Sequence, residues 1–251
     1  MSELTLAAPT ALKTGIVAGI LGGAVAPANP GCNLIGVATF NWLLQFDTAA
    51  AALKTGGAKP VADANSGYAF VDEMVQGKHI QPVTFGGVTP GANGSFSVAQ
   101  GLDLIMPIYL DAAGTSVLIL PLKGARFTMG TLSASHNCIG HYNGEGLEPA
   151  NSCLPDATNH AFITGAKLGG MITLEDADTI TINSLAQSLC VLLSQNTAMY
   201  GEKNALGVTV CKRTNGVINF QGDTCSMAGS TCKDAVVLSG DFAASSIQIN
   251  N

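Results

Sequence analysis

The chain has 251 residues, of which 47% are hydrophobic and only 11% are charged, and its net charge is −6. Disordered chains are poor in apolar residues and rich in charge, so this composition excludes disorder over most of the length. The 11 Lys and Arg residues form no basic stripe interleaved with aromatics, which argues against a nucleic-acid partner and against an anionic membrane surface. We therefore expect a folded protein whose surface is wetted mainly by hydroxyl, amide and backbone groups.

The first 34 residues are interpreted as an apolar amino-terminal arm. Residues 15–28 are rich in Gly and Ala, follow Lys13, and weakly resemble the hydrophobic region of a secretory signal. This run is too short and too rich in glycine to predict a membrane span. We expect the arm to lie in a groove of its own core or of a neighbouring subunit, as in strand addition. Residues 35–251 are expected to form a single β-rich domain, with a candidate sub-boundary near residue 134.

The segment after the arm alternates apolar runs with small-residue stretches. Residues 36–47 form an apolar run that holds the only tryptophan, Trp42. Residues 49–67 are rich in Gly, Ala, Asn and Asp, and this composition predicts a linker or a long loop. Residues 68–75 are compatible with a strand or with a short helical turn.

The clearest predicted element is a β-hairpin. Apolar side chains alternate over residues 102–110, residues 111–114 supply a turn, and residues 115–122 return as an apolar strand. Pro107 and Pro121 lack a backbone N–H, so we expect each to face a sheet edge or a bulge.

Two Asn-Gly pairs predict tight turns of the hairpin type. Asn93-Gly94 precedes a short strand over residues 95–99, and Asn215-Gly216 joins strands over residues 208–212 and 217–221.

One helix is predicted over residues 183–195, where apolar side chains recur at helical spacing and Asn183 can cap the first turn. The preceding residues 171–182 are expected to be strand-like, as are residues 235–238 and 242–249. Roughly ten to twelve short strands and one or two short helices predict a mainly β protein, an antiparallel β-sandwich or jelly-roll.

The chain has seven cysteines, six of which lie after residue 130. Local pairing predicts three disulfides that staple the carboxyl-terminal half, although buried free thiols and other connectivities stay open. Disulfides favour an oxidising compartment, so we expect an extracellular, cell-surface or periplasmic location. Cys32 is left over as a free or intermolecular thiol. The expected pairs are Cys138–Cys153, Cys190–Cys211 and Cys225–Cys232.

Two polar clusters could carry chemistry. Three histidines and a glutamate fall in one polar stretch, and imidazoles with a carboxylate can hold Zn²⁺. A solvated loop is the alternative that we favour there, so we predict no cofactor. Glu175, Asp176 and Asp178 could act as acid and base or bind Ca²⁺, or could simply form a solvated acidic turn. The candidate metal ligands are His136, His141, Glu145 and His160.

The sequence lacks the G-x-S-x-G, G-x-G-x-x-G, P-loop and H-E-x-x-H motifs, which removes support for several enzyme classes. Low charge, β structure and an apolar arm favour a non-catalytic structural protein outside the cytoplasm. It would self-assemble through the arm as a homo-oligomer, in a filament, coat or surface layer. One alternative is a secreted module that binds a small ligand or glycan. A second is a metal-dependent hydrolase that uses the loop between His136 and His160.

Overall fold

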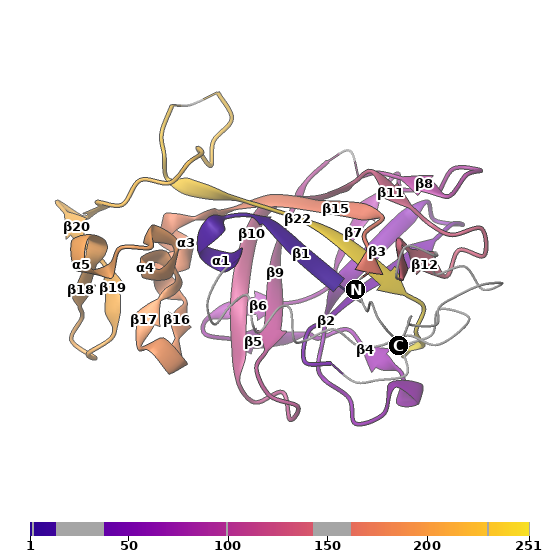
Figure 1. The fold of residues 1–251 in the computed structure, drawn as a ribbon, viewed down its shortest axis with the longest axis horizontal. Helices are drawn as coiled ribbons and strands as arrows, with labels where there is room; N and C mark the ends of the chain where they lie inside the picture. The colour runs from indigo at the N-terminus through magenta and orange to yellow at the C-terminus, as the bar shows by residue number, and fades with distance from the viewer. Residues whose placement is uncertain (2, 14–37, 99, 143–161, 230, 251) are drawn as a thin grey trace.

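A computed structural model describes residues 1, 3–13, 38–98, 100–142, 162–229 and 231–250. The protein is mainly β, as predicted, and most of its strand pairs are antiparallel. Its largest sheet has the strand order β1-β22-β15-β10-β9, with β12 paired to the end of β22 (Figure 1). The bounds of these strands are Glu3–Ala8 for β1, Leu102–Tyr109 for β9, Val117–Thr128 for β10, Cys138–Ile139 for β12, Ala166–Thr173 for β15 and Ala235–Ser245 for β22.

A three-stranded sheet forms the second layer of a sandwich. It has the order β2-β3-β7, with β2 at Asn41–Asp47, β3 at Ala52–Ala58 and β7 at Val83–Gly86. Phe85 of β7 meets Phe127 of β10 edge to face at 5.8 Å between ring centres, and Phe127 meets Phe242 of β22 at 5.7 Å. All three rings are buried, so aromatic contacts fill the space between the two sheets.

The loop expected over residues 49–67 is wrong for residues 52–58, which form β3, the central strand of the smaller sheet, whereas residues 59–67 form no strand. The small residues of β3 permit close approach of another strand. A Cβ atom on Gly57 would lie 2.3 Å from Cγ of Pro107, so only glycine lets β3 pack this tightly against β9. Glycine in a strand marks such a close backbone approach as readily as it marks a loop.

The predicted hairpin is confirmed by β9 and β10, which pair from Tyr109↔Val117 to Leu102↔Ala125. Pro107 lies on β9, the edge strand of the large sheet, where a missing N–H costs no ladder bond on the outer side. Pro121 lies in the part of β10 that precedes its pairing with β15 and a β-bulge.

Both Asn-Gly turns are confirmed. Gly94 has a φ of 76° and leads into β8 (Ser95–Phe96), which pairs with β11 (Gly130–Thr131). Asn215 and Gly216 have φ values of 52° and 83° and connect β20 (Arg213–Thr214) to β21 (Val217–Ile218). Two successive positive φ angles are what a type I′ hairpin turn requires.

The strand expected over residues 171–182 is only partly correct. Strand β15 ends at Thr173 and helix α3 (Leu174–Thr179) follows it. The Thr173 hydroxyl caps this helix by accepting the Asp176 backbone N–H at 3.1 Å. Acidic residues in the first turn also favour a helix, because its amino terminus carries partial positive charge.

The helix predicted from Asn183 begins later, at Leu189, and ends at Ser194 (α4). Its cap is Ser188, whose hydroxyl accepts the Val191 backbone N–H at 3.3 Å. Asn183 instead starts a single 3₁₀ turn, and Ala186 then adopts a left-handed conformation that interrupts the helical periodicity.

Residues 174–229 and 231–234 belong to a lobe between β15 and β22, which are paired neighbours in the large sheet. We call this the C-terminal lobe. Its sheet has the order β16-β17-β19-β18, and it contains the disulfides Cys190–Cys211 and Cys225–Cys232. Its remaining elements are β16 (Thr181–Ile182), β17 (Gln187–Ser188), α5 (Thr197–Tyr200), β18 (Gly201–Lys203) and β19 (Thr209–Cys211).

The remaining short elements connect or extend the sandwich. They are α1 (Thr10–Lys13), a 3₁₀ turn (Ala64–Ser66), β4 (Tyr68–Ala69), β5 (Glu73–Val75), β6 (Lys78–Ile80), β13 (His141–Tyr142), β14 (Phe162–Ile163) and β23 (Ile249–Asn250). None of the helices among the described residues is long and apolar enough to cross a membrane.

The described part of the amino-terminal arm belongs to the chain's own fold. Strand β1 pairs with β22, and Leu4, Leu6 and Leu12 are buried in the main core. Residues 15–28 and Cys32, on which the assembly hypothesis depends, lie outside the described residues.

Candidate functional site

A cavity of about 240 Å³ lies between strand β2, the end of β22 and the loop over residues 132–139. Figure 1 shows this end of the sandwich, where both chain termini lie close to β2, β4 and β12. The cavity combines apolar walls with a few polar groups. It is lined by Met1, Asn41, Trp42, Leu43, Leu44, Phe46, Tyr68, Leu132, His136, Asn137, Cys138, Ile139, Ala244, Ser245, Ser246, Ile247 and Ile249.

Trp42 reaches the cavity from β2. This strand pairs with β3, where Trp42 lies opposite Gly57. On its other side, the α-amino group of Met1 donates a hydrogen bond to the Trp42 carbonyl, and burial lowers the pKa of that amino group to about 5. The Trp42 side chain is 1% exposed, and its indole Nε1 has no hydrogen-bond partner. A buried N–H donor is therefore left unsatisfied at this site.

Tyr68 reaches the same cavity from β4. Its backbone N–H donates to the Gln248 carbonyl at 2.9 Å, and the parallel pairing of Tyr68 with Ile249 on β23 fixes its position. Burial raises the pKa of Tyr68, so its phenol is neutral at physiological pH. The side chain is 1% exposed, and its hydroxyl also lacks a hydrogen-bond partner.

A tight loop forms the third wall of the cavity. The Ser133 hydroxyl accepts the backbone N–H groups of Asn137 at 3.3 Å and Cys138 at 3.2 Å. These bonds support His136 in a left-handed conformation with a φ of 57°, and its side chain is exposed beside the cavity. Ile139 then returns to the sheet by pairing with Ala244 of β22.

The electrostatics of the cavity are simple. None of the described residues that line it is Asp, Glu, Lys or Arg. The indole and phenol are the buried side-chain polar groups without partners among the described residues. Leaving such a group unsatisfied costs about 1–3 kcal/mol each. The cavity therefore has an uncharged lining among the described residues, and two of its residues carry a buried polar group without a partner.

The predicted metal ligands are not brought together by the described residues. His136 lines the cavity, His141 belongs to β13, and Glu145 and His160 lie outside the described residues. That metal site stays a prediction. Two other groups of potential ligands exist in the described chain, one around Asp178 and one around Asp234. Each includes two cysteines already joined as a disulfide, so these sulfurs are not thiolate ligands.

Two of the three predicted disulfides are confirmed. Cys190–Cys211 joins α4 to β19 in the C-terminal lobe, and Cys225–Cys232 closes a loop before β22. Cys138 is also disulfide-bonded, but the predicted Cys138–Cys153 pair extends outside the described residues.

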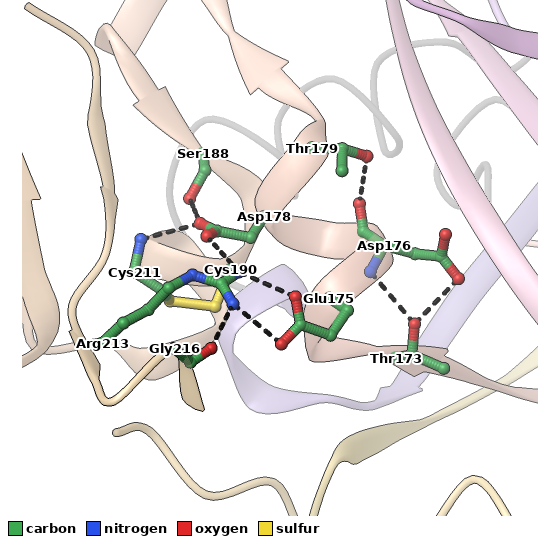
Figure 2. Close-up of polar contacts among 10 residues, drawn as sticks. All are labelled: Thr173, Glu175, Asp176, Asp178, Thr179, Ser188, Cys190, Cys211, Arg213 and Gly216. Carbon is green, nitrogen blue, oxygen red and sulfur yellow. Dashed lines mark hydrogen bonds and ion pairs between the residues drawn. A yellow bond between two sulfur atoms is a disulfide. The ribbon is translucent and has the colours of Figure 1, made fainter. Parts of the chain in front are cut away.

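The acidic cluster proposed as a catalytic or calcium site is structural. Arg213 donates to both carboxylate oxygens of Glu175, at 2.9 and 2.8 Å, and to Asp178 at 3.0 Å (Figure 2). Asp178 also accepts the Ser188 hydroxyl at 2.8 Å and the Cys211 backbone N–H at 2.7 Å. These contacts tie α3 to the cap of α4 and to β19.

Asp176, also on α3, makes a separate set of contacts. It takes part in the helix cap with Thr173 and forms an ion pair with Lys78 of β6. Burial acts to raise the pKa of Asp176, but hydrogen bonds from Lys78 and Thr173 outweigh it and lower that pKa. The carboxylates of Glu175 and Asp178 thus hold parts of the C-terminal lobe to one another, and that of Asp176 ties the lobe to β6.

Comparisons with protein-family models, with curated proteins and with solved structures found no match for this chain. The candidate site therefore depends on its own geometry.

The sequence pattern did not predict the cavity, because Trp42 and Tyr68 lie far apart in the chain. The signal that could have found them is that both are aromatic residues with a polar atom, set in apolar surroundings where that atom needs a partner. The pairing of β4 with β23 brings the last residues of the chain to Tyr68, and a contact of two residues in length has no recognisable sequence pattern.

Proposed function

We propose that the protein is an extracytoplasmic binding protein that holds a small ligand in the cavity beside β2. One observation carries this proposal: the Trp42 Nε1 and Tyr68 hydroxyl groups are buried and unpartnered, and both residues line one cavity. Buried polar groups in native proteins are nearly always hydrogen-bonded, and the exceptions require an explanation. A ligand in this cavity that gains access to either group would supply one.

The proposed location has separate support from the cysteines. Disulfides persist in oxidising compartments and are rare in the cytosol. Cys190–Cys211 and Cys225–Cys232 are both formed, and no cysteine among the described residues is free. Disulfide-bonded cysteines of this kind support an extracellular, cell-surface or periplasmic location.

The test is a small-molecule screen by thermal unfolding, because a ligand that binds only the native state raises the unfolding midpoint. Each hit is measured again on Ala244→Phe, which places a large ring on the cavity wall, and on the control Ala112→Phe in the exposed turn between β9 and β10. We expect the hits to lose their effect on Ala244→Phe and to keep it on Ala112→Phe. Hits that act equally on both variants would refute the cavity as the binding site.

Self-assembly as a coat, filament or surface-layer subunit is the second candidate. It is favoured by large apolar side chains exposed on and beside the C-terminal lobe, of which Leu206 is 87% exposed and Val217 is 68% exposed. Exposed apolar surface of this kind commonly marks protein contacts. Light scattering and electron microscopy of the wild type and of Leu206→Asp with Val217→Asp would test it. A monomer in both samples would exclude it.

A further inference from the structure

We propose that the Cys225–Cys232 disulfide, once reduced, becomes a zinc site in which both thiolates and the Asp234 carboxylate bind the ion. The two sulfur atoms and a carboxylate oxygen of Asp234 lie within 4.8 Å of one another. Thiolate sulfur and carboxylate oxygen are both ligands that Zn²⁺ accepts in proteins. The site lies in the C-terminal lobe, so it is independent of the ligand binding proposed for the cavity beside β2.

The Asp234 carboxylate is held beside the sulfurs before any metal binds. Its Oδ1 lies 3.3 Å from Sγ of Cys232. The Ser226 backbone N–H and hydroxyl donate to its two oxygens at 2.7 and 2.6 Å and fix its orientation. Hydrogen bonds to a carboxylate ligand from outside the metal's own ligand set are a common feature of metal sites, because they orient that ligand.

The loop between the two cysteines is exposed enough to adjust to a metal ion. A tetrahedral ion with Zn–S distances of about 2.3 Å holds two sulfurs roughly 3.8 Å apart, so the reduced side chains must separate. The Cα atoms of Cys225 and Cys232 are 5.0 Å apart, and both side chains are only half-buried. Met227 and Ala228 in the loop are exposed. Side-chain rotation can therefore separate the sulfurs without repacking a core, and water can take the fourth position on the ion.

The chemistry needs a reductant and then the metal. A dithiol reductant passes two electrons and two protons to Cys225 and Cys232, whose S–S bond breaks, while its own two sulfurs become joined as a disulfide. Zn²⁺ then displaces one proton from each cysteine thiol and forms two Zn–S bonds, so two protons are released for each ion bound. Because the metal joins the same two residues, the loop stays closed in the reduced protein.

The second group of potential ligands, Asp178 with Cys190 and Cys211, gives an internal comparison. Both of its cysteines are fully buried, so a reductant reaches them less readily. Its carboxylate already accepts hydrogen bonds from three other residues of the lobe, which a metal would have to displace. We therefore assign the zinc site to the half-buried pair alone.

The experiment uses Co²⁺ as a spectroscopic substitute for Zn²⁺, because thiolate ligands give Co²⁺ a strong charge-transfer absorption in the near ultraviolet. The full chain is reduced with a phosphine, which takes an oxygen atom from water and offers no thiolate to the metal. Alkylation and peptide mass spectrometry identify the reduced cysteines. After the phosphine is removed, Co²⁺ is titrated into the protein without air and is then displaced by Zn²⁺.

We expect one Co²⁺ per chain, with the charge-transfer absorption present only after Cys225 and Cys232 are reduced. Zn²⁺ should abolish the absorption and protect these two thiols from alkylation. Asp234→Asn should weaken metal binding by at least about tenfold, since changing even a residue that only supports a ligand typically costs about 10–100-fold. Asp223→Asn is the matched control, because it removes the same charge near Cys225 from a residue outside the group of ligands, and it should leave the affinity unchanged.

Three results would overturn the zinc site. The first is no charge-transfer absorption in wild-type protein with both thiols free, a measurement that does not depend on the folding of a variant. The second is equal affinity in Asp234→Asn and the wild type, because the carboxylate would then not be a ligand. The third is absorption that persists when Cys225→Ser and Cys232→Ser are combined, which would place the thiolates at other cysteines. The effect of Ala244→Phe on small-molecule binding tests the proposed function separately.

Discussion

Trp42 and Tyr68 lie on different strands and both line one cavity, and the indole of the first and the phenol of the second each have a buried polar atom without a hydrogen-bond partner. They approach it from opposite faces of the smaller sheet, since Trp42 packs in the main core and Tyr68 in a separate small cluster with Leu43 and Ala58. Each unsatisfied buried polar group lowers the stability of the fold, and two of them beside one cavity are a reason to test for a ligand.

The cost of the unpartnered phenol can be measured without any ligand. Tyr68→Phe removes the buried hydroxyl and keeps the ring, so the desolvation cost disappears while the packing remains. We expect the free energy of unfolding to rise by about 1 kcal/mol, within the range of about 1–3 kcal/mol assigned to an unsatisfied buried group. Urea unfolding of the ligand-free protein measures this change.

Tyr109 provides the matched control for that measurement. It is also 1% exposed, but its hydroxyl donates to Glu73 at 3.4 Å. Tyr109→Phe removes a hydrogen bond that exists, so we expect it to lower the free energy of unfolding or leave it unchanged. A loss of stability in Tyr68→Phe as large as that in Tyr109→Phe would show that the Tyr68 hydroxyl already has a partner.

The parts of the sandwich that could be predicted are those whose sequence signal lies within a few neighbouring residues. Such signals identified the hairpin of β9 and β10 and the two Asn-Gly turns. The central strand β3 was missed because its glycines serve a contact with Pro107, which lies far along the chain. Cysteine spacing similarly predicted Cys190–Cys211 and Cys225–Cys232, because each pair is close in sequence.

The roles of the polar residues were predicted less well, because these roles depend on contacts between residues far apart in the chain. Glu175 and Asp178 are grouped in sequence on α3 as a catalytic pair could be, but their ion-pair partner Arg213 lies far along the chain on β20. The cavity residues show the reverse problem, since nothing in the sequence indicates that Trp42 and Tyr68 share a cavity. The wrong role for the acidic pair and the missed cavity both concern contacts between residues far apart in the chain. Local sequence patterns carry no information on such contacts.

Arg213 is expected to hold the elements of the C-terminal lobe together, because its partners Glu175 and Asp178 both lie within that lobe. Asp178 has a side chain that is only 8% exposed, so little water is available to replace the hydrogen bond from Arg213. Arg213→Met should lower the free energy of unfolding by about 1.5–3 kcal/mol, the contribution typical of hydrogen bonds to charged groups. Hydrogen exchange of α3, α4 and β19 should increase more than that of β9 and β10.

Lys167→Met is the control for Arg213. Lys167 forms an ion pair with Asp241 at 2.6 Å, but the two side chains are 50% and 35% exposed. Exposed pairs contribute about 0–1 kcal/mol, so this variant should stay close to the wild type. If both variants lose the same stability, the buried position of Asp178 is not what makes Arg213 important.

The disulfides Cys190–Cys211 and Cys225–Cys232 are expected to differ in how much each stabilises the fold and in how readily a reductant reaches each. Their cysteines are separated by 21 residues in Cys190–Cys211 and by 7 in Cys225–Cys232. Loop-closure entropy predicts losses of about 3 and about 2 kcal/mol when each pair is replaced by alanines. Cys190 and Cys211 are fully buried, so mild reductant followed by alkylation should label Cys225 and Cys232 first. Earlier labelling of the buried pair would indicate that the lobe opens before the loop does.

The acid sensitivity of the loop closed by Cys225–Cys232 should depend on Asp234. Its carboxylate accepts the Ser226 hydroxyl at 2.6 Å and the Ser226 backbone N–H at 2.7 Å, and these bonds lower its pKa. At Asp234 the unfolded chain therefore binds a proton more readily than the folded protein. The stabilisation from these bonds is complete above the ordinary Asp pKa of about 3.9. It is lost as the pH falls through the lower pKa of the folded protein.

Unfolding by urea at a series of pH values between about 2 and 6 would measure this contribution, since that interval spans the ordinary pKa of an aspartate. We expect Asp234→Asn and Ser226→Ala each to flatten the pH dependence, the first because no proton is exchanged and the second because one of the two bonds is lost. The flattening should be smaller for Ser226→Ala, whose backbone N–H still donates to Asp234. A slope equal to that of the wild type in both variants would place the acid sensitivity of the protein at other carboxylates.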